Sequence, residues 1–222
     1  MLPGIRQFFA ARKSPAWRNP YITDGLVAMW DGEWNAGGGV HDPTAMTWKD
    51  IVGNRMLDIG SNSFGDNCLL ATESLGASSD DTIDLYTGTL ELVCEANPTT
   101  RSVFVLLGGN SFQYTMGMFY DSSTGRIGVF NPQKSFSFDV STDRHCAYSY
   151  DGTNPNAYVN GLPTSIFDGG LRSYGTIHIG GSGGRTVSLN GKVFCTRVYS
   201  RALTATEIAA NYAVDQQRFN LP

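Results

Sequence analysis

The stretch LNGKVFCTRVYSRALTATEI, residues 189–208, decides the fold of this chain. After Gly191 its first half reads as a β-strand with a buried face, ending at Val198 and Tyr199. A helix is expected directly afterwards. Thr204 is placed to cap the first free N–H groups, and Glu207, three residues later, can reach back to the cap. The chain therefore closes with a strand that turns into a capped helix.

The bulk composition favours one β-rich domain. The 222 residues are enough to bury a core without disulfide bonds, and sandwiches of this length often form one domain. Only 16 % of the residues are charged and 26 are glycine, which suits short strands joined by tight turns. The formal net charge of −4 argues against a nucleic-acid partner, and no apolar run is long enough to span a membrane.

Strand-like runs recur along the chain with no helix between them. They cover residues 24–30, 67–71, 82–85, 89–95, 102–107, 113–120, 126–130, 135–140, 144–150, 156–160, 176–179 and 192–199. Turn-forming residues separate them, and the Asn160-Gly161 pair favours a type I′ hairpin turn. The pattern predicts an all-β sandwich of two antiparallel sheets with a short C-terminal helix.

Several short phrases are similar to laminin-G-like modules, and they occur in the same order as in that family. They are DGLVAMW at 24–30, WKDIVGN at 48–54, RHCAYSYDG at 144–152, AYVNG at 157–161, IHIGG at 177–181 and the closing stretch with Tyr212. The similarity covers about residues 24–213. This resemblance implies the concanavalin A-like jelly-roll fold. It also implies a binding role, because members of the family mostly bind ligands and rarely catalyse reactions.

The chain is expected to divide into a basic arm, residues 1–23, and a laminin-G-like domain, residues 24–222. The arm has four basic residues and no acidic one, which leaves a formal charge of −8 for the remainder. Such an arm could dock on an acidic partner or a membrane surface, or could simply be solvated. Arg6, Arg12 and Lys13 interrupt any apolar core of a signal peptide, so synthesis and folding in the cytoplasm are expected.

The four cysteines are Cys68, Cys94, Cys146 and Cys195. Their long, irregular spacings include no C-x-x-C pair, which argues against a zinc site. Three of them lie in strand-like runs, where a free cysteine behaves as a small apolar residue. All four are interpreted as reduced core residues, with a disulfide pair as the alternative.

Three aromatic residues are candidates for contact with a sugar, which usually needs a ring platform beside polar groups. Trp34 lies in the Gly-rich loop at residues 31–43, where no core pattern requires it, although it could equally anchor that loop. Tyr120, beside Asp121, and Tyr174 are the weaker candidates. Trp30 and Trp48 lie in strand patterns and are expected in the core.

Calcium is the cofactor that the resemblance implies, held at the rim of the sandwich. Asp31, Asp42, Asp50 and Asp121 lie in or beside loops and offer the oxygen ligands that calcium prefers. No spacing among them defines a site, and aspartate is also a common turn former.

No catalytic residues are predicted. Glu91 and Glu95 share one face of a strand about 13 Å apart, wider than the carboxyl pair of a glycosidase. We interpret them as a solvent face opposite a buried row of Leu90, Leu92 and Cys94. His145 and His178 are interpreted as structural strand residues.

The sequence thus predicts a noncatalytic carbohydrate-binding or adhesion module on a phage or bacterial surface, with a glycan or cell-surface polysaccharide as partner. The alternative is a bacteriophage virion structural protein, such as a decoration, head-fibre or tail protein, docked on a virion partner by residues 1–23. A virion role would also explain the missing export signal. A glycoside hydrolase is the remote alternative. Homo-oligomerisation stays open, since no heptad repeat specifies it.

Overall fold

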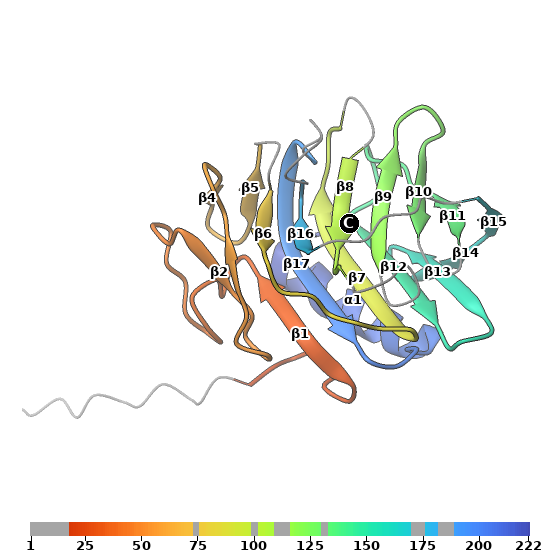
Figure 1. Ribbon diagram of the computed structural model, residues 1–222, viewed down its shortest axis with the longest axis horizontal. Coiled ribbons are helices and arrows are strands. Elements are labelled where there is room, and N and C mark those ends of the chain that lie inside the picture. Colours follow the sequence, from red (N-terminus) through yellow and green to blue (C-terminus); the bar gives the residue numbers. More distant parts are fainter. Residues whose placement is uncertain are drawn as a thin grey trace, which may run out of the picture.

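The computed structural model describes residues 18–72, 76–98, 102–108, 116–129, 133–169, 176–181 and 189–222. Two antiparallel sheets pack face to face as a sandwich, and one helix follows the last strand (Figure 1). The jelly-roll sandwich predicted from the sequence is confirmed.

The first sheet contains eight strands: β1 (Leu26–Asp31), β4 (Ser63–Phe64), β5 (Leu69–Ala71), β7 (Gly88–Glu95), β12 (His145–Tyr150), β13 (Pro155–Val159), β14 (Leu162–Thr164) and β17 (Gly191–Tyr199). Their spatial order is β14-β13-β12-β7-β17-β5-β4, and β1 also pairs with β17. The closing strand of the sequence is therefore central, because β17 pairs with β7 along one edge and with β1 and β5 along the other.

The second sheet contains nine strands: β2 (Thr47–Lys49), β3 (Met56–Asp58), β6 (Ala77–Ser79), β8 (Ser102–Leu106), β9 (Gly117–Asp121), β10 (Arg126–Val129), β11 (Lys134–Ser137), β15 (Ile166–Asp168) and β16 (Ile177–Ile179). Their spatial order is β15-β11-β10-β9-β8-β16-β6-β3-β2.

The core lies between the two sheets and follows the two-residue period of the strands. In β7 the inward row is Leu90, Leu92 and Cys94, as predicted, and all three are buried in the main apolar cluster. Trp30 and Trp48 are also fully buried there, which confirms their predicted core position. All four cysteines are buried and free of disulfide bonds, as predicted.

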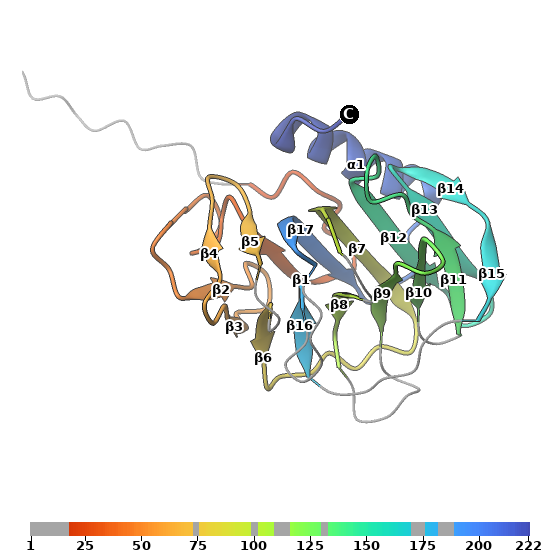
Figure 2. The ribbon, with the colours of Figure 1, turned by 90° about the horizontal axis from the view of Figure 1, so that it is seen from above.

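Helix α1 (Ala205–Phe219) lies on the outer face of the eight-stranded sheet (Figure 2). The predicted capping box is present: Thr204 Oγ1 accepts from the Glu207 N–H, and Glu207 Oε2 accepts from the Thr204 N–H. The buried face of the helix consists of Ile208, Asn211, Tyr212, Asp215 and Phe219, spaced at helical intervals. No helix in the described ranges has the length and apolar character needed to cross a membrane.

The turn between β13 and β14 packs closely against α1. Asn160 and Gly161 have φ values of 48° and 74°, the left-handed conformation that a type I′ turn requires at both positions. A Cβ on Gly161 would lie 2.8 Å from the ring of Tyr212. Glycine is needed there both for its backbone conformation and for the close approach of the helix.

Some local structure differs from the expectation. Residues 82–85 form no strand, although the Ile83 N–H donates to the Leu107 carbonyl. The short strands β2, β3, β4, β6, β14 and β15 were not expected. Residues 19–23, assigned to the arm, pack against the domain, since Tyr21 is buried and the Ile22 N–H donates to Asn211 Oδ1.

Candidate functional site

Trp34 lies in its loop with one face covered. The guanidinium carbon of Arg218, near the end of α1, is 3.5 Å from the centre of the Trp34 ring. The ring is half-buried and packs at the edge of the apolar cluster that contains Phe219. These contacts anchor the loop to the helix, and a role of Trp34 in ligand binding stays a prediction.

Of the other two predicted aromatic contacts, only Tyr120 lies in the described part of the chain. Tyr120 on β9 is buried, and its ring stacks on Phe104 with centroids 5.6 Å apart. Its place in the core leaves little of the ring for a ligand. Tyr174 lies outside the described residues.

Asp31 and Asp50 are fully buried and bind arginine. Arg218 Nη1 donates to Asp31 Oδ2 at 2.6 Å, while Asp31 Oδ1 accepts the N–H groups of residues 33 and 34. Arg55 Nη1 donates to Asp50 Oδ2 at 3.0 Å, and Asp50 Oδ1 accepts the N–H groups of residues 29 and 52. Both carboxylates are thus used in holding loops.

The predicted calcium ligands do not come together. Asp42 and Asp121 each organise a separate turn, accepting from the backbone and hydroxyl of Thr44 and Ser123, respectively. Within the ranges that the structure describes, no three His, Cys, Asp or Glu side chains are grouped to hold a metal. The donor set around these aspartates therefore does not fit the calcium that the family resemblance implied.

The position of Glu91 corrects the sequence interpretation. Its side chain does lie opposite the inward row of β7, but this face is covered by α1 and Glu91 is fully buried. Arg197 Nε donates to Glu91 Oε2 at 2.7 Å, and Asn211 Nδ2 donates to the same oxygen at 2.8 Å. Although burial alone would raise the pKa of Glu91, the charge of Arg197 lowers it below its usual value. Glu95, four residues further along β7 on the same face, is exposed as predicted.

A network of buried charges continues from Glu91 into the helix. Arg197 Nη1 and Nη2 donate to the two carboxylate oxygens of Asp215 at 2.8 and 2.7 Å. The Tyr21 hydroxyl donates to Asp215 at 2.7 Å, and His145 Nε2 lies 3.4 Å from Glu91 Oε1. Because every one of these groups is buried, the network joins the helix, the sheet and residues 19–23, and offers no surface to a substrate.

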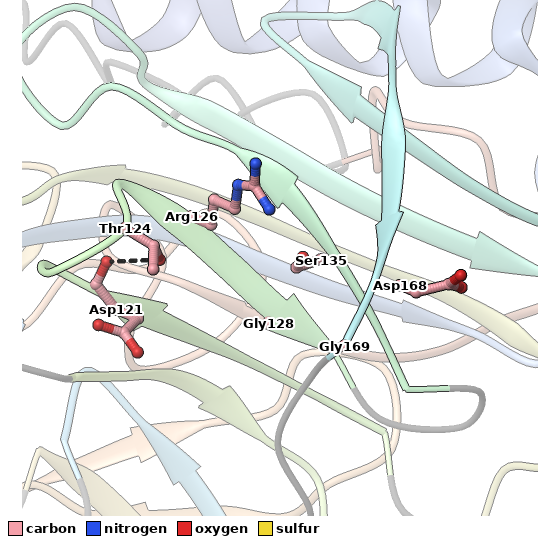
Figure 3. A pocket seen from close by; sticks show the side chains of 7 residues that line it. All are labelled: Asp121, Thr124, Arg126, Gly128, Ser135, Asp168 and Gly169. Carbon is pink, nitrogen blue, oxygen red and sulfur yellow. Dashed lines mark hydrogen bonds between the residues drawn. The ribbon is translucent and has the colours of Figure 1, made fainter.

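A pocket of about 290 Å³ lies on the opposite side of the sandwich, over one end of the nine-stranded sheet (Figure 3). Its lining residues come from β9, β10, β11, β15 and the adjoining turns: Asp121, Thr124, Arg126, Gly128, Ser135, Asp168 and Gly169. Cross-strand register explains the arrangement. Gly128 pairs with Ser135, Ser135 pairs with Phe167, and these positions face away from the core residues Ile127 and Phe136.

One acidic group of the pocket forms a salt bridge, whereas Arg126 contacts an aromatic ring. Lys134 Nζ lies 2.5 Å from Asp168 Oδ1, and this hydrogen bond lowers the pKa of Asp168 below its usual value. The guanidinium carbon of Arg126 lies 4.0 Å from the centre of the Phe167 ring, a cation–π contact. Among the described residues, Arg126 forms no salt bridge, although the carboxylate residue Asp121 is its cross-strand partner on β9.

Sequence reasoning named only Asp121 among the residues of this pocket. The pocket joins side chains up to 48 positions apart, from Asp121 to Gly169, and β15 was not expected as a strand. One signal was present: Arg126 opens an otherwise apolar strand-like run just after a Gly-containing turn. Such a position places a charged side chain at the end of a sheet face.

Solved structures with the same fold include two of the sialidase of Trypanosoma rangeli. One superimposes with a TM-score of 0.61 at 18 % identity, over 86 % of this chain and 33 % of the sialidase chain. A second, a complex with 2,3-difluorosialic acid described as a covalent intermediate, gives a TM-score of 0.62 at 18 % identity, over 91 % and 35 %. The present chain thus spans about a third of the sialidase chain, and at this identity the likeness concerns the fold alone.

No curated protein sequence matches the chain. Residues 72–209 match the family Laminin_G_3, described as the concanavalin A-like lectin/glucanases superfamily. This match covers well over half of the chain and includes both the predicted hairpin turn and the capping box. The chain belongs to the concanavalin A-like lectin/glucanases superfamily.

Proposed function

We propose that this domain binds glycans, without cleaving them, at the pocket over β9, β10, β11 and β15. The observation that carries the proposal is the composition of that pocket in a domain of the lectin/glucanases superfamily. A sugar needs an aromatic or apolar surface for its C–H face and a few fixed polar groups for its hydroxyls. Phe167, 37 % exposed, lies against the lining residue Arg126 at the edge of the pocket and supplies the ring. Thr124, Ser135 and the charged lining residues supply the polar groups.

The shape of the pocket supports recognition of a single sugar unit. Gly128 has no side chain, so the sheet face is open between Arg126 and Ser135. The volume of about 290 Å³ is at the low end for ligand pockets, which span roughly 300–1,000 Å³. We therefore expect contact with a chain end or one exposed residue of a polysaccharide, and modest affinity for each site.

The absence of catalysis is supported by the two carboxylates of the pocket. Asp121 and Asp168 lie on β9 and β15, three strand spacings apart, which amounts to about 14 Å. A glycosidase pair needs about 5–10 Å. A general acid also needs a raised pKa, whereas the hydrogen bond from Lys134 lowers that of Asp168.

The test is a glycan and bacterial cell-wall array probed with the purified chain and two matched variants. Phe167→Ala removes the exposed ring beside the pocket, next to Arg126, whereas Leu162→Ala removes a side chain that is 68 % exposed on β14, in the other sheet. The proposal expects binding that Phe167→Ala abolishes and Leu162→Ala leaves intact, with melting temperatures unchanged. Reducing-end release from any bound glycan would refute the noncatalytic part, and no retained glycan would refute the whole.

A virion structural role, as a decoration, head-fibre or tail protein, is the second candidate. It is supported by the position of residues 18–23, which lie by α1 on the outer face of the eight-stranded sheet (Figure 2), whereas the residues that line the pocket belong to the nine-stranded sheet. A protein attached through the arm would therefore present the pocket outward, so docking and glycan binding are compatible. Deleting residues 1–17 keeps the contacts of Tyr21 and should abolish co-sedimentation with particles while glycan binding persists. Unchanged co-sedimentation would refute docking by the arm.

A further inference from the structure

The charge balance of the pocket points to the chemical class of its ligand. Asp168 is matched by Lys134 at 2.5 Å, and Asp121 Oδ1 accepts hydrogen bonds from the Ser123 N–H and Oγ at 3.0 and 2.6 Å. Arg126 is different, because its guanidinium contacts the uncharged ring of Phe167. Within the described part of the chain, Arg126 is therefore the basic group of the pocket that forms no salt bridge, although Asp121 is its cross-strand partner on β9.

The surroundings of Arg126 favour a planar anion as its partner. A guanidinium presents its N–H donors in a rigid fork that matches the two oxygens of a carboxylate. Contact with Phe167 restrains Arg126 at the edge of the pocket, so little side-chain freedom remains to be lost on binding. Gly128 lies two positions along the same face of β10 and leaves room for the sugar ring, with the Ser135 hydroxyl on the neighbouring strand.

We infer that the pocket recognises a carboxylate-bearing sugar, such as a uronic acid, through an ion pair between its carboxylate and Arg126. This inference rests on the proposed function and specifies its ligand. The remainder of the sugar packs beside Phe167, and the Thr124 and Ser135 hydroxyls face its ring hydroxyls.

Isothermal titration calorimetry with matched sugars tests this inference. The probes are trimers of galacturonic, glucuronic and mannuronic acid, each compared with the neutral trimer of the same linkage and configuration, which differs only in a CH₂OH in place of the carboxylate. At least one acidic trimer should bind about 10- to 100-fold more tightly than its neutral counterpart, the range for a hydrogen bond to a charged group. Its affinity should also fall as salt rises from 20 to about 500 mM.

Three variants assign this preference to Arg126. Arg126→Gln keeps a polar side chain without the charge and should bind the acidic and neutral trimers alike. Arg126→Lys keeps the charge without the planar fork and should retain only part of the preference. Lys192→Gln is the control, since it makes the same change in net charge at a partly exposed position on β17, in the other sheet. Melting temperatures verify that each variant is folded, and Arg126→Lys carries the test if Arg126→Gln does not fold.

The outcomes separate the inference from the proposed function. If neutral sugars bind as tightly as acidic ones and Phe167→Ala abolishes both, glycan binding stands and the acidic ligand is refuted. If Arg126→Gln keeps the acidic preference, the assignment to Arg126 is wrong. If no probe and no glycan on the array binds, both proposals fall.

Discussion

Replacing Asp215 by asparagine tests the buried charge network that joins α1 to the eight-stranded sheet. The Asp215 carboxylate is fully buried and accepts three hydrogen bonds, two from Arg197 and one from the Tyr21 hydroxyl, at 2.7 to 2.8 Å. Asp215→Asn conserves shape but removes the charge. It also turns an amide N–H₂ group towards the donors of Arg197, which leaves that arginine only partly compensated.

The expected loss of stability follows from this geometry. Breaking a buried ion pair by removing one partner costs about 3–5 kcal/mol, because an uncompensated charge stays buried. Arg197 keeps its 2.7 Å hydrogen bond to Glu91, so we expect the lower end, about 3 kcal/mol. For a domain of 150–250 residues this amounts to a decrease in melting temperature of about 6–12 °C.

The measurement is differential scanning calorimetry with urea unfolding at pH 7. Asp24→Asn is the matched control, since Asp24 also binds an arginine, at 2.8 Å from Arg201 Nε, but its side chain is 83 % exposed. Exposed pairs contribute little, so this variant should stay within about 2 °C of the wild type. Equal melting temperatures for the two variants would refute the view that the buried network holds the helix in place.

Three further predictions concern the other contacts of the helix. Glu207→Gln should cost about 1 kcal/mol at pH 7, measured by urea unfolding, because it removes the ion pair with Arg201 and the negative charge at the start of α1, whereas glutamine can keep the capping-box hydrogen bond. Because the hydrogen bond from Arg201 lowers the pKa of Glu207 to about 2 from 4.5, the wild type should lose this contribution as the pH falls from about 4.5 towards 2. A deficit of the variant that is the same at pH 2 and pH 7 would contradict this assignment. Gly161→Ala should lower the melting temperature more than Gly125→Ala. Both glycines have left-handed φ, but an added Cβ would lie 2.8 Å from the Tyr212 ring at Gly161 and would have nothing within 4 Å at Gly125. Equal decreases in melting temperature would argue against the close approach of Tyr212. Deletion of residues 1–23 should lower the melting temperature by several degrees more than deletion of residues 1–17, because only the longer deletion removes buried Tyr21. Equal melting temperatures for the two deletions, measured by calorimetry, would show that residues 18–23 do not stabilise the domain.

Local chemistry could be predicted from the sequence where a few neighbouring residues decide it. The capping box of Thr204 and Glu207 is present, and the left-handed φ values of Asn160 and Gly161 agree with the predicted turn. The inward row of β7 was also predicted, because strand side chains alternate with a period of two. These features depend on residues no more than a few positions apart.

What covers a strand face could not be predicted in the same way. The pattern placed Glu91 on the outer face of β7 but could not show that a helix more than 100 residues later would cover it. A buried carboxylate is stable there only because Arg197 and Asn211 were brought to it by β17 and α1. The same limit applies to Asp31, whose arginine partner is residue 218.

The pocket could not be predicted from local sequence patterns either. Its walls come from four strands, and its two main features, Arg126 and Phe167, become neighbours only because β11 lies between β10 and β15. Trp34 was the stronger candidate for ligand contact in the sequence because it lies in a polar loop, but the guanidinium of Arg218 stacks on its ring. Exposure depends on tertiary packing, which single-sequence patterns do not encode.

The most direct test of the central claim is a ¹⁵N–¹H NMR titration of the isotope-labelled chain with the best glycan from the array. The account predicts that the largest amide shift changes fall in residues 117–128, 134–137 and 166–169, around the pocket, and vanish in Phe167→Ala. Shift changes concentrated in the loop at residues 31–43 or along α1, with none around the pocket, would contradict it.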